Sequence, residues 1–154
     1  MVECCPGEEK ILRVFLDGGS RGNPGEAAIG FVVYEGNGKE ICRYGKSIGV
    51  ATNNYAEYMA LIEALRWLLE YRDNYRHIIN YPIVIYSDSE LVVRQINSRY
   101  RVRDHYIAPL FKEARDMIEK IGCVELKHVR REGNKITDWI VNRVLDRKPF
   151  DILK

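Results

Sequence analysis

Three strand-like segments in succession, ahead of the first helix-like segment, restrict the possible folds of this chain most strongly. The first is an apolar run rich in β-branched residues, which ends at Asp17. A glycine-rich stretch, Gly18 to Gly25, follows it, so the sequence predicts a strand and then a loop. Gly36-Asn37-Gly38 separates the next two and predicts a hairpin, so the three strands should form an antiparallel meander. The predicted strands span residues 11–16, 27–34 and about 40–48.

The rest of the chain alternates helix-like and strand-like segments. Thr52 can N-cap a helix over residues 52–71, where apolar side chains recur at helical spacing. The resulting order, βββαβααβα, predicts an α/β fold with a five-stranded mixed sheet, three antiparallel strands followed by two parallel ones, flanked by helices. The later elements are a strand at 83–86, a helix opened by Ser87-Asp88-Ser89-Glu90, a helix at 107–121, a strand at 123–129, a polar turn at 130–134 and a helix at 135–145.

Length and composition narrow the class of protein. A chain of 154 residues fits one domain, 1–154, with loosely ordered ends at 1–10 and 148–154. No apolar run approaches the ~20 residues that cross a bilayer, and the N-terminus lacks the pattern of a secretory signal, so we expect a cytoplasmic monomer. The net charge of +2 places any nucleic-acid site in a local patch. The four cysteines include no C-x-x-C pair, which argues against zinc, and leave disulfide pairing open.

Four acidic residues stand where ligands bind in α/β proteins. Asp17 ends the first strand and Asp88 follows the fourth, so their carboxylates should meet at one sheet edge if these strands are parallel neighbours. Glu57 and Asp138 each lie about one turn into a helix and can lean toward that edge. A single acid is ordinarily a surface group, but two adjacent charges repel by ~4 kcal/mol at an effective dielectric of 20. An oxygen-lined cluster therefore predicts Mg²⁺ or Mn²⁺, and two such ions form the usual clamp for phosphodiester attack.

The blocks around these acids resemble the four signature blocks of type 1 ribonucleases H, in particular the compact archaeal branch. The resemblance implies a ribonuclease H-like fold and an endoribonuclease that hydrolyses the RNA strand of RNA/DNA hybrids to 5′-phosphate and 3′-hydroxyl ends. It implies that the four acids bind two ions, one activating a water and the other stabilising the departing 3′ oxygen, and it leaves double-stranded RNA open as a second substrate. The blocks are Asp17–Gly25, Thr52–Ile62, Ser87–Asn97 and Asn134–Asp138.

The resemblance also implies contacts to nucleic acid. The glycine-rich stretch lacks the G-K-[ST] ending of a triphosphate-binding loop, and by resemblance it contacts the RNA strand. Thr52 is expected at a phosphate of the DNA strand, and Asn53 and Asn54 at minor-groove and 2′-hydroxyl groups, which distinguish RNA from DNA. Independently of the resemblance, Arg94 opens a basic and aromatic stretch that could be a solvated face or a binding patch, and its place directly after Asp88 favours binding. The predicted nucleic-acid contacts are Gly18, Gly19, Ser20, Asn23, Thr52, Asn53, Asn54 and Arg94.

Two departures from the family pattern stand out. The basic, Trp-rich helix of many bacterial members is missing, and a short linker takes its place. The loop before Asp138 lacks the family's histidine that helps product leave, which makes Arg131 and Glu132 the candidates to replace it; His128 is expected to be structural.

Two other functions remain open. One is a related acidic-cluster nuclease, such as an integrase-like transferase or junction resolvase, although that class usually carries additional domains. The other is a hybrid-binding module with a decayed active site, which the presence of all four acids and both polar blocks disfavours.

Overall fold

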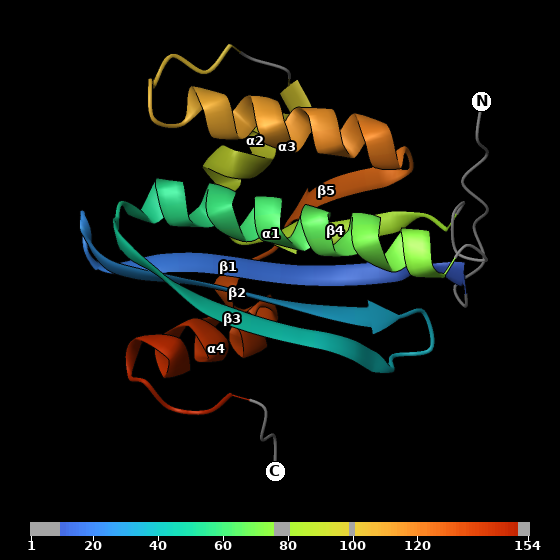
Figure 1. The fold of residues 1–154 in the computed structure, drawn as a ribbon, viewed down its shortest axis with the longest axis horizontal. Coiled ribbons are helices and arrows are strands. Elements are labelled where there is room, and N and C mark those ends of the chain that lie inside the picture. Colours follow the sequence, from blue (N-terminus) through green and yellow to red (C-terminus); the bar gives the residue numbers. More distant parts are fainter. Residues whose placement is uncertain (1–9, 76–80, 99–100, 151–154) are drawn as a thin grey trace.

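The computed structural model describes residues 10–75, 81–98 and 101–150, in which five strands form one mixed sheet of order β3-β2-β1-β4-β5 (Figure 1). Neighbours among β1, β2 and β3 are antiparallel, whereas β4 is parallel to both β1 and β5. This arrangement confirms the predicted fold class and element order. The strands are β1 (Leu12–Gly22), β2 (Gly25–Glu35), β3 (Glu40–Ala51), β4 (Ile83–Ser87) and β5 (Val124–His128). The helices are α1 (Asn53–Asn74), α2 (Glu90–Ser98), α3 (Ala108–Ile121) and α4 (Lys135–Leu145), with a 3-10 turn, η3 (Arg131–Gly133), before α4.

The glycine-rich stretch is not the loop that the sequence predicted. β1 continues through it to Gly22, which pairs with Gly25 of β2, so the turn shrinks to Asn23 and Pro24. The physical reason is packing: a Cβ on Gly18 would lie 2.3 Å from the carbonyl carbon of Ala56. The glycine is needed where α1 crosses β1 closely, rather than for a flexible turn, and the antiparallel ladder continues past Asp17.

Helices cover both faces of the sheet (Figure 1). The apolar stripe of α1 buries Leu61, Leu65 and Leu68 against one face, and α3 packs on α1. On the opposite face α4 lies on nearly bare backbone, because Cβ atoms on Gly30 and Gly45 would approach Ile140 Cγ2 within 2.9 and 2.8 Å. The sheet is therefore enclosed where α4 crosses it, and that crossing fixes the position of α4 relative to β1.

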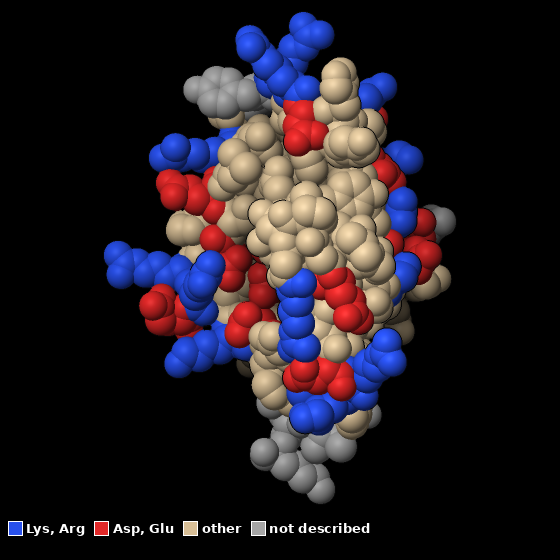
Figure 2. Space-filling model, turned by 90° about the vertical axis from the view of Figure 1, so that its left-hand side faces the viewer, with Lys and Arg blue, Asp and Glu red and all other residues tan. Residues whose placement is uncertain are grey.

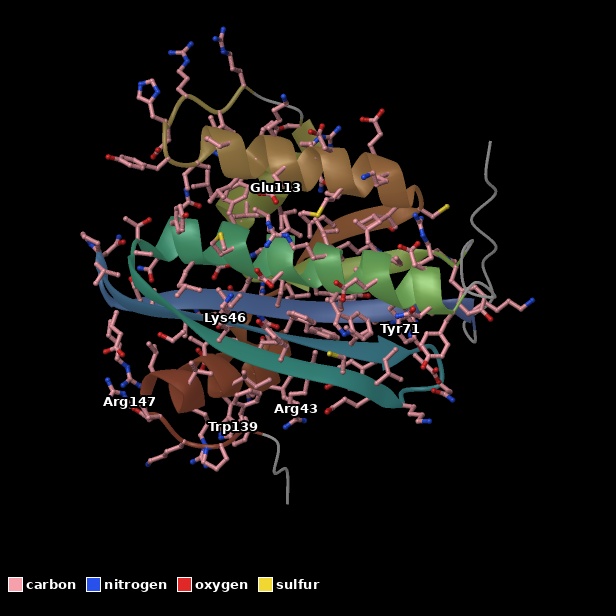
Figure 3. The ribbon with its side chains drawn as sticks, viewed as in Figure 1. Arg43, Lys46, Tyr71, Glu113, Trp139 and Arg147 are labelled. Atoms are coloured by element: carbon pink, nitrogen blue, oxygen red, sulfur yellow. The ribbon has the colours of Figure 1, made fainter. Side chains whose placement is uncertain are left out.

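The outer side of α4 is held by cationic and aromatic groups. Trp139 lies beside Arg43 of β3, whose guanidinium carbon is 6.0 Å from the indole centroid (Figure 3). Arg43 also donates to the carbonyl oxygen of Phe150 at 3.0 Å, and Arg143 donates to that of Pro149 at 2.7 Å. The chain after α4 is thus bonded to the body as far as Phe150, while the rest of the predicted loose ends, 1–9 and 151–154, lies outside the described residues.

Two further features concern the described part of the chain. No helix in it combines the length and apolar character needed to cross a membrane.

The cysteines of the described residues differ in state. Cys42 is a free thiol, and burial raises its pKa to about 11. Cys123 is disulfide-bonded, and the other two cysteines lie outside the described residues.

Candidate active site

Three carboxylates converge where β1 and β4 stop pairing. Leu16 pairs with Ser87 in the parallel ladder, so Asp17 and Asp88 each follow the last paired residue of adjoining strands. Glu57 reaches the same point from α1, and one carboxylate oxygen from each of the three residues lies within 4.8 Å of the others. Asp138, from the first turn of α4, lines the same cavity, whose volume is about 570 Å³. The structure thus brings three of the four predicted acids together and places Asp138 on the same cavity, while their roles as metal ligands and catalytic residues stay predictions.

Burial makes this cluster electrostatically unfavourable without a cation. Asp17 and Glu57 are each 7% exposed. Desolvation raises the pKa of Asp17 to about 7, with the charges of Asp88 and Asp138 acting in the same direction. Desolvation, followed by the charge of Asp17, raises the pKa of Glu57 well above its ordinary value. Burial therefore shifts both carboxyl groups toward their neutral forms when no cation is bound. A buried all-oxygen donor set of this kind suits a hard divalent cation, and Asp17, Glu57 and Asp88 can hold one.

Glu57 is oriented by two neighbours. The backbone N–H of Gly18 donates to Glu57 Oε1 at 3.2 Å, and the buried hydroxyl of Ser87 donates to Glu57 Oε2 at 3.4 Å. The Ser87 oxygen also accepts from the N–H of Ser89 at 3.1 Å. Ser87 was not predicted as a site residue, although its place at the end of a buried strand, directly before Asp88, could have indicated it.

Asn134 connects the helix of Asp138 to the strand of Asp17. It is fully buried, its side-chain nitrogen donates to the carbonyl oxygen of Leu16 at 2.8 Å, and its side-chain oxygen accepts from Thr137 Oγ1 at 2.6 Å. This residue was also missed, because a polar side chain before a helix is first interpreted as a cap; here α4 receives no side-chain cap bond.

Some of the residues that were predicted to contact nucleic acid form hydrogen bonds with one another. The N–H of Ser20 donates to Asn53 Oδ1 at 2.9 Å, and the N–H of Asn53 donates to Asn23 Oδ1 at 3.0 Å. These bonds fasten the β1–β2 hairpin to the start of α1. Thr52 is the N-cap of α1, as predicted, and accepts from the N–H of Tyr55 at 3.1 Å.

Asn54 differs from these residues. Its side-chain oxygen is buried without a hydrogen-bond partner in the described structure, and the residue lines the cavity. Because an unsatisfied buried acceptor costs roughly 1–3 kcal/mol, this oxygen is suited to a donor supplied by a ligand.

The cavity brings together most, but not all, of the predicted residues. Asn23 and Thr52 are used in the bonds given above, and Arg94 is an exposed residue of α2 that pairs with Glu90 at 3.0 Å. Acidic and basic side chains lie side by side at the end of the molecule that holds the β1–β2 hairpin, below an uncharged area (Figure 2). The predicted residues on the cavity are Asp17, Gly18, Gly19, Ser20, Asn53, Asn54, Glu57, Asp88 and Asp138; Arg21, Ser89, Leu91, Arg131, Lys135, Val141, Asn142 and Leu145 complete it.

A mixed sheet of this order, with carboxylates gathered where its first and fourth strands stop pairing, defines the ribonuclease H-like class of α/β proteins. The model of the reverse transcriptase-like family matches residues 15–144. The crystal structure of ribonuclease H1 from Halobacterium salinarum superposes with a TM-score of 0.79 at 33% identity over 89% of this chain and 98% of that one. LC11-RNase H1, isolated from compost and crystallised in complex with an RNA/DNA hybrid, gives 0.82 at 33% identity over 88% of this chain and 97% of that one.

The chain belongs to the type 1 ribonuclease H family. Its sequence is 34% identical to ribonuclease HI of Halobacterium salinarum over 135 residues, which are 88% of this chain and 64% of that protein. It is 33% identical to a bifunctional protein of Mycobacterium tuberculosis over 84% of this chain and 34% of that protein. The chain thus spans less than two thirds of the length of these curated relatives.

Proposed function

We propose that this protein is an endoribonuclease that hydrolyses the RNA strand of RNA/DNA hybrids, leaving 5′-phosphate and 3′-hydroxyl ends. The observation that carries the proposal is the convergence of Asp17, Glu57 and Asp88 within 4.8 Å in a cavity that Asp138 also lines. The hybrid bound to the similar LC11-RNase H1 supports this choice of substrate. We also propose that residues 1–154 act as one domain and as a monomer in the cytoplasm.

The cofactor in this proposal is a pair of Mg²⁺ or Mn²⁺ ions held by Asp17, Glu57, Asp88 and Asp138. When bound, such ions activate the attacking water and stabilise charge on the departing oxygen. The protein's own task is to hold the ligands: Gly18 and Ser87 orient Glu57, and Asn134 fixes α4 and with it Asp138. Preorganised carboxylates need no rearrangement when the reaction occurs.

Selection of the RNA strand is assigned to the start of α1. The unpartnered oxygen of Asn54 accepts from a 2′-hydroxyl, the group that a DNA strand lacks. The Asn53 oxygen already accepts from Ser20, so its amide nitrogen is the atom left for a base edge in the minor groove. The backbone of Gly18, Gly19 and Ser20 faces the RNA strand across the same cavity. Nucleic-acid contacts remain predictions for Asn23, Thr52 and Arg94. A role in product release likewise remains a prediction for Arg131 and Glu132.

The experiment compares RNA/DNA, RNA/RNA and DNA/DNA duplexes, labelled on one strand, with Mg²⁺, with Mn²⁺ and with a chelator. Metal-dependent cutting of RNA in the hybrid supports the proposal, and cutting of RNA/RNA would add double-stranded RNA as a substrate. Junction DNA as the preferred substrate would favour a related acidic-cluster nuclease. Binding of hybrid without cutting in any metal would favour a decayed binding module.

A further inference from the structure

The cavity of acids is also lined by two cations that the acids do not neutralise. Arg131 lies in η3 and Lys135 is the first residue of α4; both are exposed. Within the described residues neither side chain forms an ion pair or a hydrogen bond. Arg21, on the same cavity, differs because it pairs with Asp146 at 2.6 Å. Two positive charges thus remain available beside four carboxylates.

Lys135 occupies a position that does not help its helix. The N-terminus of a helix carries a partial positive charge, so a cation in the first turn is repelled. α4 also lacks a side-chain cap that would offset this repulsion. Asp138 is one turn further along the same helix, yet the Lys135 ammonium is not within ion-pair distance of it. The local structure therefore gives no account of a lysine here, whereas the cavity does.

The position of Lys135 is nevertheless fixed. Its neighbour Asn134 is fully buried and bonded to Leu16 of β1, so the backbone of Lys135 is held at a set place relative to the acids. Arg131, in contrast, belongs to a three-residue turn that contains no buried residue. Of the two cations, Lys135 therefore has the better-defined backbone position relative to the acids.

We propose that Lys135 contacts a phosphate of the RNA strand inside the cavity, next to the bond that is cut. This inference rests on the proposed function. Metal ions at the carboxylates would take up the acidic charge, which leaves the backbone phosphates as the anions that a free ammonium meets. A lysine suits this role as a point charge that needs no fixed geometry, and a phosphate contact positions the strand without reading its sequence.

The test measures binding of a fluorescent RNA/DNA hybrid across a salt series. The protein carries Asp88→Asn so that the hybrid stays intact, alone or with Lys135→Ala or Lys135→Arg. Lys120→Ala is the matched control: this exposed lysine lies in the last turn of α3, near the start of β5 and thus at the opposite end of the parallel strands from Asp88. Cutting of the same hybrid by the unsubstituted protein tests the proposed function separately.

Lys135→Ala is expected to weaken binding at low salt on the order of tenfold and to reduce the slope of log Kd against log salt by about one. Lys135→Arg should restore most of both, and Lys120→Ala should match its parent. The melting temperature of Lys135→Ala should stay level or rise, since a charge that repels the helix end is removed. An affinity and a slope equal to those of Lys120→Ala would overturn the inference, even if the unsubstituted protein cuts the hybrid.

Discussion

Asn134 donates its buried side-chain amide to the carbonyl oxygen of Leu16 at 2.8 Å, which ties the start of α4 to the residue that precedes Asp17. This hydrogen bond, together with the packing of α4 on Gly30 and Gly45, sets the relative position of two carboxylates that are 121 positions apart in the chain. The site is consequently sensitive to a residue that contacts no ligand.

Asn134→Ala should lose stability and activity together. Removal of the amide leaves the Leu16 carbonyl and the Thr137 hydroxyl without this partner, at a cost of about 1–3 kcal/mol. Chemical denaturation measures the loss, and cleavage is compared at a temperature where both proteins are folded. Asn97→Ala is the control, because Asn97 donates to the carbonyl of Leu126 at 2.9 Å and neither residue lines the cavity of the acids. A variant at 134 that is less stable but turns over as fast as Asn97→Ala would refute the positioning role.

Asp17→Asn should stabilise the metal-free protein, and the gain should grow with pH. The pKa of Asp17 is raised from 3.8 to about 7, so the folded state binds more protons than the unfolded state between these values. The unfolding free energy contributed by this group therefore falls as pH rises from about 4 to about 7. The difference between variant and unsubstituted protein should increase over that window by roughly 1–3 kcal/mol and then level off.

In the presence of a divalent cation, the unsubstituted protein should become more stable than Asp17→Asn. Mg²⁺ binds the folded state and stabilises the unsubstituted protein more than Asp17→Asn. Thermal melts with chelator and with Mg²⁺ at several pH values provide the measurement. If the stability difference between Asp17→Asn and the unsubstituted protein depends on neither pH nor Mg²⁺, Asp17 is an ordinary surface acid.

Neighbouring glycines should tolerate alanine very differently. Gly18→Ala would place a Cβ 2.3 Å from the backbone of Ala56, so α1 must shift from β1 and carry Glu57 with it. Gly19→Ala meets only Val141 Cγ1, at 3.8 Å, an ordinary contact. Overpacking of this kind costs about 1–3 kcal/mol or more. Equal unfolding free energies for the two variants would contradict the close crossing of α1 and β1.

Asn54→Ala should weaken discrimination between strands without weakening the fold. Its side-chain oxygen is buried and unpartnered in the described structure, so its removal costs no protein hydrogen bond. We expect the variant to have a higher KM for the hybrid. Replacing the adjacent ribose by deoxyribose should reduce its cleavage less than it reduces cleavage by the unsubstituted protein. Asn37→Ala, in the β2–β3 turn, is the control. Discrimination unchanged relative to Asn37→Ala would remove Asn54 from substrate recognition.

The element order was predictable, because hydrophobic periodicity is a local property of the sequence, and so was the meeting of Asp17 and Asp88, because each follows an apolar run and these two runs pair in parallel. The extent of β1 was not, since glycines that indicate a turn can also mark a close crossing, and Ala56 lies 38 positions after Gly18. The bonds of Ser87 and Asn134 depend on tertiary distances that no local pattern contains. For the same reason, the cavity position of Lys135 emerged only from the structure, whereas the Glu90 partner of Arg94, four positions away in the same helix, is a local pair that the sequence could have indicated.

The most direct test of the central claim is single-turnover cleavage of a hybrid labelled on its RNA strand, by the unsubstituted protein and by Asp88→Asn, with saturating Mg²⁺ or Mn²⁺. Loss of a metal ligand removes several kcal/mol of transition-state stabilisation, so we expect Asp88→Asn to be slower by about a hundredfold or more while it melts normally and still binds the hybrid. Equal rates for the two folded proteins would contradict a reaction centred on Asp17, Glu57 and Asp88.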